Sequence, residues 1–210
     1  MNALFERSWT RAWSALVGAG AEPGKADGTA LRDALLVRYA EPQRKYHTRQ
    51  HLEECLALFD EVGELAAHPA EVEMALWFHD AIYDVKGSGN EERSAEWAHE
   101  ALLDVGVTRE VADRVRQLVL VTKHDGVPAS IDEQVLVDID LAILGAERPR
   151  FDEYERQIRD EYGYVPGFLF RRKRRQILRI FLDRPVLYST PALRDRLDAR
   201  ARENLRRAVG

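Results

Sequence analysis

Cysteine is almost absent from the chain, since Cys55 is the only one in 210 residues. A single cysteine excludes an intrachain disulfide, and we therefore expect a cytoplasmic protein. Long apolar runs are also missing: no stretch approaches the roughly 18 uninterrupted apolar residues of a transmembrane helix, so no membrane partner is expected. The segment Met1–Val17 does not resemble a secretory signal, because Glu6, Arg7 and Arg11 interrupt what would be its apolar core.

The sequence also lacks strand patterns, internal repeats, low-complexity segments and a convincing domain linker. Hydrophobic residues make up 45% and charged residues 32% of the chain, which is the balance of an ordinary globular protein. The formal net charge of −5 argues against a nucleic-acid-binding protein as a whole. We expect one compact, all-helical domain over residues 1–210, with a core at 41–145 between N-terminal helices (1–40) and C-terminal helices (146–210) packed on it.

Apolar residues recur at helical spacing in most of the chain. One stripe opens the sequence, and we interpret it as core packing or as the contact of a homodimer: Phe5, Trp9, Trp13 and Leu16. Breakers follow at Gly18, Gly20, Pro23 and Gly24. Further helices are predicted at about 29–39, 46–62, 69–78, 90–105, 108–123, 132–144, 151–162, 166–182 and 191–209.

Histidines are the first candidates for chemistry. The chain has six, at positions 47, 51, 68, 79, 99 and 124. His47 and His51 are four residues apart and are predicted to share a helix face. The alternatives for His47 are that it lines a site, caps its helix or hydrogen-bonds across the core. His68 and His99 are interpreted as structural, and His124 either interacts with a helix dipole or has a functional role.

Acidic residues interrupt two apolar segments. Asp80 follows His79 directly after the run Ala75–Phe78, and a carboxylate buried there needs a cation, a metal ion or strong hydrogen bonds. Asp138 and Asp140 lie inside the apolar segment VLVDIDLAIL, where two like charges raise each other's pKa unless a cation compensates them.

A histidine, a His-Asp pair about 30 residues later and an aspartate in a later apolar helix resemble the H…HD…D pattern of the HD superfamily. Several short segments of the sequence resemble those of a bacterial branch described as predicted metal-dependent HD phosphohydrolases. The segments that carry this resemblance are YHTRQHLEECL, WFHDAIYD, NEERSAEWA, TKHD, DIDLAILG, YERQIRDEY and ARENL, and they span most of the chain.

The resemblance implies an HD-type helical bundle with a metal held by His51, His79, Asp80 and Asp140, Asp138 being the alternative to Asp140. Two imidazoles and two carboxylates suit a divalent ion such as Mn, Fe, Co, Ni, Zn or Mg. Such an ion lowers the pKa of a bound water and polarises a phosphoryl group.

Supporting roles are expected for further polar residues, from their positions alone. Lys123 is the candidate for stabilising phosphoryl charge, together with His124 and Arg93, and Asp84 for activating or orienting water. The basic run Arg171–Arg175 is interpreted as a solvated helix face, with an anion or nucleotide contact as the rival.

The resemblance thus predicts a phosphohydrolase that acts on a small phosphorylated or nucleotide-like molecule. Two alternatives stay open: a metal-containing nucleotide- or anion-binding module without turnover, and a di-iron oxygenase, for which His47 and His124 are the candidate additional ligands.

Overall fold

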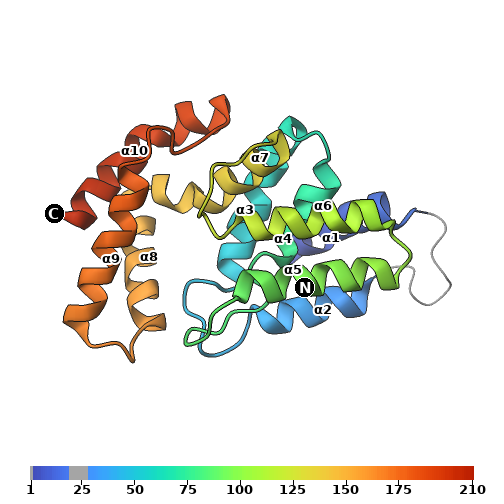
Figure 1. The fold of residues 1–210 in the computed structure, drawn as a ribbon, viewed down its shortest axis with the longest axis horizontal. Helices are drawn as coiled ribbons and strands as arrows, with labels where there is room; N and C mark the ends of the chain where they lie inside the picture. The colour runs from blue at the N-terminus through green and yellow to red at the C-terminus, as the bar shows by residue number, and fades with distance from the viewer. Residues whose placement is uncertain (1, 19–27) are drawn as a thin grey trace. The chain divides into compact units, whose positions relative to one another are not determined.

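The computed structural model describes residues 2–18 and 28–210, and over these residues it is helical without a strand (Figure 1). The all-helical prediction is confirmed. The breakers predicted at Gly20, Pro23 and Gly24 lie outside the described residues. None of the described helices is long and apolar enough to cross a membrane. The α-helices are α1 (Ala3–Val17), α2 (Thr29–Arg38), α3 (Arg49–Val62), α4 (Pro69–Phe78), α5 (Asn90–Asp104), α6 (Arg109–Val121), α7 (Ile131–Asp140), α8 (Arg148–Glu161), α9 (Gly167–Leu182) and α10 (Pro191–Val209), and the short 3-10 helices are η2 (Gly63–Leu65) and η3 (Leu141–Gly145).

Residue contacts divide the chain into two compact units, Met1–Val137 and Asp138–Gly210. The boundary falls within α7 and differs from the segment limits near 40 and 145 that the sequence suggested.

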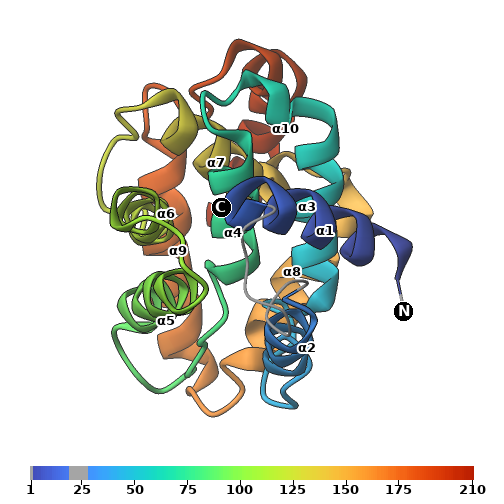
Figure 2. The same ribbon diagram turned by 90° about the vertical axis from the view of Figure 1, so that its right-hand side faces the viewer.

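The first unit is built around α4, which contacts α1, α3, α5 and α6 (Figure 2). Its residues from Glu71 to Phe78 are all buried. The Trp9 ring stacks on Trp13 at 5.3 Å and meets Trp77 edge-on at 5.1 Å. The indole N–H of Trp77 donates to Ser8 Oγ at 3.0 Å. The aromatic stripe of α1 is therefore core packing against α4.

Two buried glutamates on α4 are neutralised by arginines. Glu73 accepts from Arg11 of α1 at 2.8 Å, and Glu71 accepts from Arg114 of α6 at 2.7 and 2.8 Å. A buried carboxylate without such a partner would be costly. The ion pairs therefore fix α1 and α6 against the central helix, whose carboxyl end carries His79 and Asp80.

Helix α3 begins later than predicted. Thr48 is its N-cap, with Oγ1 accepting from Gln50 N at 3.3 Å, and the helix starts at Arg49. A threonine hydroxyl at this position satisfies one of the free amides of the first turn. Tyr46 and His47 consequently lie in the preceding loop, and the prediction that His47 and His51 share a helix face is wrong.

The second unit packs α8, α9 and α10 with η3. Tyr188 is fully buried and donates to Leu141 O at 3.0 Å, and Asn204 donates to Leu144 O at 3.0 Å. The basic run Arg171–Arg175 lies on α9. Arg174 contacts Glu155 of α8 at 3.1 Å, while the other four members are exposed, which fits the interpretation as a solvated face.

Candidate metal centre

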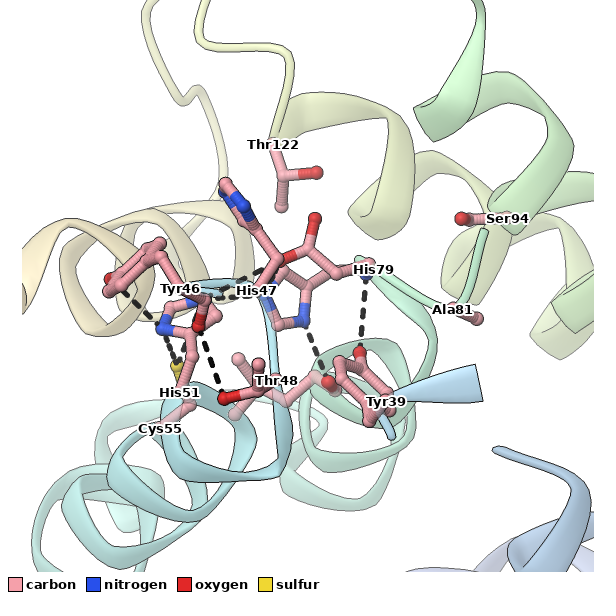
Figure 3. Close-up of polar contacts among 12 residues, drawn as sticks. Tyr39, Tyr46, His47, Thr48, His51, Cys55, His79, Ala81, Ser94 and Thr122 are labelled. Carbon is pink, nitrogen blue, oxygen red and sulfur yellow. Dashed lines mark hydrogen bonds and ion pairs between the residues drawn. The ribbon is translucent and has the colours of Figure 1, made fainter. Parts of the chain in front are cut away.

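Three ligand atoms converge in the first unit. His51 Nε2 and His79 Nε2 are 3.1 Å apart, and Asp80 Oδ2 lies 3.2 Å from His79 Nε2 and 3.6 Å from His51 Nε2. Both histidines are buried, at 2% exposure each. Figure 3 shows the two imidazoles facing each other, His51 from the first turn of α3 and His79 from the end of α4. The structure therefore brings these three predicted residues together.

The protonation of His79 follows from its backbone partner. Its Nδ1 lies 2.7 Å from Leu76 O, one turn earlier on α4. A carbonyl oxygen only accepts, so Nδ1 carries the proton and a neutral His79 presents the lone pair of Nε2 to the cluster. Hydrogen bonding of the remote nitrogen is the usual way in which a metal-binding histidine is oriented.

His51 is held on both sides of its ring. Its Nδ1 lies 3.0 Å from the hydroxyl of Tyr46, a buried residue of the loop before α3. The hydroxyl can accept the Nδ1 proton, which again leaves Nε2 with its lone pair toward His79. Tyr46 therefore has the position of a residue that orients a ligand, and the sequence had not singled it out for this role.

Cys55 lies one helical turn after His51 and is buried beside it. Its sulfur is 3.7 Å from His51 Nδ1 and 3.8 Å from Nε2, so it lies along the lone-pair direction of neither nitrogen. The ligand atoms of His51, Cys55 and His79 are nevertheless within 4.8 Å of one another. The spacing of four residues from His51 was the available signal for Cys55, which entered the sequence argument only through the absence of disulfides.

The carboxylate of Asp80 is ionised in these surroundings. Burial alone would raise its pKa, but the interactions with His79 and His47 outweigh burial and hold the pKa of Asp80 well below its ordinary range. Its backbone N–H donates to Tyr39 Oη at 3.3 Å. The pKa of Tyr39 is raised by burial and by the charge of Asp80, so its hydroxyl keeps its proton and donates to Trp77 O at 3.2 Å.

Arg44 joins the two segments that carry the cluster. Its side chain is completely buried and donates to His47 O at 3.2 Å, to Ala81 O at 3.0 Å and to Asp80 O. A buried guanidinium needs several acceptors in fixed directions, and these carbonyls supply them. Arg44 thus holds the loop of Tyr46 and His47 against the His79-Asp80 turn, a long-range role with no local sequence signal.

His47 lines the surroundings of the cluster through its ring. It stacks on Tyr83 at 4.0 Å and lies edge-on to His51, with ring centroids 6.1 Å apart. His47 contributes positive charge that lowers the pKa of Asp80. Of the interpretations left open, capping does not apply because Thr48 makes the cap, and lining the site fits the ring contacts of His47.

Asp138, the alternative fourth ligand, is engaged within the second unit. Its Oδ1 accepts from Ser189 N, and its Oδ2 accepts from Thr190 N and Thr190 Oγ1, each at 2.7 Å. Burial raises the pKa of Asp138, although these hydrogen bonds oppose the shift. The carboxylate therefore anchors the start of α10. Asp140, at the end of α7 in the same unit, stays a predicted ligand.

Two of the residues predicted for supporting roles, Lys123 and Asp84, have partners of their own. Lys123 forms an ion pair with Glu92 of α5, which raises the pKa of Lys123 and lowers that of Glu92. Asp84 shapes its own loop, since Oδ1 accepts from Lys86 N at 2.9 Å. Thr122, the neighbour of Lys123, is drawn near the cluster in Figure 3, but its hydroxyl donates to Val119 O at 2.7 Å.

His124 adopts a left-handed backbone conformation, with φ of 57°. Histidine tolerates this region better than most residues with a side chain, and such positions are frequent at turns and sites. His68 and His99 bond to Asp132 at 2.8 Å and Asp113 at 2.9 Å, which fits their structural interpretation.

A divalent cation fits the donor set of the first unit. Two imidazole nitrogens that bind one ion at about 2.1 Å and at right angles lie about 3 Å apart. His51 Nε2 and His79 Nε2 have this separation, and an ionised carboxylate faces both. Nitrogen and oxygen donors in this combination suit transition-metal ions and zinc.

Comparison of the chain with models of protein families, with curated proteins and with solved structures gave no match. The interpretation of the site therefore depends on its geometry and on the resemblance described above.

Proposed function

We propose that the chain is a metal-dependent phosphohydrolase of the HD type, acting on a small phosphorylated or nucleotide-like substrate. The observation that supports this proposal is the convergence of His51 Nε2, His79 Nε2 and Asp80 Oδ2 within 3.6 Å of one another. Bound there, a divalent ion would lower the pKa of water and polarise a phosphoryl oxygen.

The protein's own contribution is to present these donors in one arrangement. Leu76 O fixes the ring of His79, Tyr46 fixes His51, and Arg44 keeps the two segments together. Donors held in advance need no rearrangement when charge develops in the transition state. The resemblance adds Asp140 as the proposed further ligand.

The test combines metal analysis with a phosphatase screen. Wild-type protein is expected to contain close to one equivalent of a divalent transition metal and to hydrolyse at least one phosphate ester with Mn, Co or Ni. His79→Gln and Asp80→Asn are expected to lose the metal and the turnover. His99→Gln serves as the matched control, because His99 lies outside the cluster and pairs with Asp113.

Each alternative has its own signature in the same experiment. Metal content that persists in both site variants contradicts the site. If a ligand raises the thermal stability but is not hydrolysed, the result supports a binding module instead of a hydrolase. Two irons per chain with a di-iron absorption spectrum would support an oxygenase instead.

A further inference from the structure

A surface pocket of about 380 Å³ lies in the first unit beside the candidate metal centre. Ligand sites for small molecules begin at about 300 Å³, so the pocket can hold a small organic group. It is formed by the end of α2, the loops after α2 and α4, and the first turn of α5. The polar and aromatic residues of its lining include Arg38, Glu41, Tyr83, Asp84, Lys86 and Arg93.

Cationic side chains outnumber acidic ones in this lining by three to two. Three side chains of the pocket are cationic: Arg38, Lys86 and Arg93. Of the two acids, Glu41 is bound by Arg38 at 2.9 Å and by the buried Arg44 at 3.2 Å, and these arginines lower its pKa against the effect of burial.

The other acidic residue of the lining, Asp84, forms hydrogen bonds within its own loop. Asp84 accepts from the backbone of Lys86, and its main chain is tied to the side chain of Asn90. Glu92, next to Arg93, is held by Lys123. Arg93 itself is exposed and forms no ion pair within the described part of the chain, so its guanidinium is available to a ligand.

Tyr83 connects this pocket with the candidate metal centre. It lines the pocket, and its ring stacks on His47, which lies beside His51. The pocket and the three converging ligand atoms are thus separated by two aromatic rings. The ring centroids of Tyr83 and His51 are therefore at most about 10 Å apart, a span that a small molecule with two polar ends can bridge.

We propose that the pocket binds a second anionic group of the substrate, a phosphate or carboxylate, through Arg93 with Lys86 and Arg38. This inference depends on the proposed function in one respect, because the proposed function assigns the reacting phosphoryl group to the metal centre. Guanidinium groups recognise such oxyanions through paired, charge-assisted hydrogen bonds. The substrate class is therefore a small molecule with two anionic groups, and Tyr83, Ile82 and Val85 contact the part between them.

Calorimetric titration of the full chain with inorganic pyrophosphate, with and without metal, tests the pocket. Arg93→Gln is expected to weaken pyrophosphate binding by about tenfold or more in both conditions, since a charged hydrogen bond is lost. The matched control is Arg109→Gln, another exposed arginine in the first turn of a helix, outside the pocket. It is expected to bind as wild type does.

Two results would overturn the pocket assignment: unchanged binding by Arg93→Gln, or equal weakening by Arg109→Gln, which indicates a general charge effect. The proposed function fails separately. If the wild type binds pyrophosphate through Arg93 but hydrolyses no phosphate ester, the pocket assignment stands and the proposed hydrolase activity is contradicted. If Arg93→Gln hydrolyses the substrate with an unchanged KM, the hydrolase proposal stands, but the pocket does not take part in substrate recognition.

Discussion

At the scale of single residues, His51 and His79 are oriented in different ways. His79 is fixed by a backbone carbonyl of its own helix, whereas His51 relies on the side-chain hydroxyl of Tyr46. A hydroxyl can be removed by mutation while a carbonyl cannot. The contribution of ligand orientation can therefore be measured at His51.

Tyr46→Phe is expected to weaken metal binding by about 10- to 100-fold, because loss of a ligand's hydrogen-bond partner typically has an effect of this size. The ring of Tyr46 remains to pack beside His51, from which its centroid is 4.7 Å away. Competition with a metallochromic chelator measures the affinity. Tyr164→Phe, at an exposed position in the second unit, is the control, and equal affinity of the two variants would contradict the orienting role.

Cys55 offers a second test at this scale. Because its sulfur lies beside the His51 ring and not in line with either nitrogen, Cys55→Ser is expected to keep its metal content. The cobalt-loaded wild type should then lack a thiolate-to-cobalt absorption band in the near ultraviolet. A strong band that disappears in Cys55→Ser would instead make the thiolate a ligand.

At the scale of elements, the site depends on how the loop before α3 meets the end of α4. Arg44 makes this connection through three main-chain carbonyls and Glu41. Its guanidinium also lies over the rings of Tyr39 and Tyr83, at 5.3 and 5.6 Å. The same side chain therefore supports the metal centre and the wall of the neighbouring pocket.

Arg44→Met should lower the free energy of unfolding by about 2–4 kcal/mol, since buried acceptors lose a charged donor. Metal affinity should fall in parallel because the two ligand-bearing segments lose their connection. Urea unfolding and chelator competition measure the two effects. Arg116→Met, which removes an exposed pair with Glu96, is expected to change stability by less than about 1 kcal/mol.

The contact of α1 with α3 predicts a dependence on pH. Burial would raise the pKa of Asp60, but Arg7 and Arg11 outweigh it and lower the pKa below its ordinary value. An acid with a lowered folded pKa contributes stability above its unfolded pKa of about 3.9 and loses it as the pH falls through the folded value. Asp60→Asn should therefore be less stable than wild type at neutral pH, by up to about 1 kcal/mol. The difference should shrink below about pH 4 in urea titrations, and a difference that stays constant would contradict the ion-pair explanation.

At the scale of the whole molecule, charge is distributed unevenly. Residues 138–210 contain 17 arginines and lysines against 12 aspartates and glutamates, a net +5, so the remaining residues carry −10 of the total of −5. The histidine-rich centre lies in the acidic unit. A bound divalent cation offsets part of that negative charge and is expected to stabilise the native state.

Removal of the metal should lower the melting temperature. A ligand present at about 100 times its Kd contributes about 2.7 kcal/mol, which corresponds to roughly 5–10 °C for a chain of this size. Thermal unfolding with and without EDTA measures the shift. His79→Gln should not respond to EDTA, and an equal response of wild type and variant would place the stabilising metal elsewhere.

The sequence by itself determined the helical class and much of the donor set. Apolar periodicity and proline and glycine positions predicted the helices, because helix spacing and termination are local properties. The His79-Asp80 pair stood out because polar groups next to an apolar run require partners, whereas His51 was joined to it only by the resemblance. The late start of α3 was missed, since a threonine cap and a helical threonine look alike until the chain direction is known.

Only the tertiary structure decided which side chains surround those donors. Tyr46, Arg44 and Tyr83 act through contacts with residues distant in sequence or through rings that stack across loops. It also showed that the Asp138 carboxylate anchors Ser189 and Thr190. Such pairings depend on where separate helices end in space, and no local pattern encodes that position. His51, His79 and Asp80 are therefore recognisable in the sequence as residue types, whereas the convergence of their donor atoms follows only from the packing of α3 against α4.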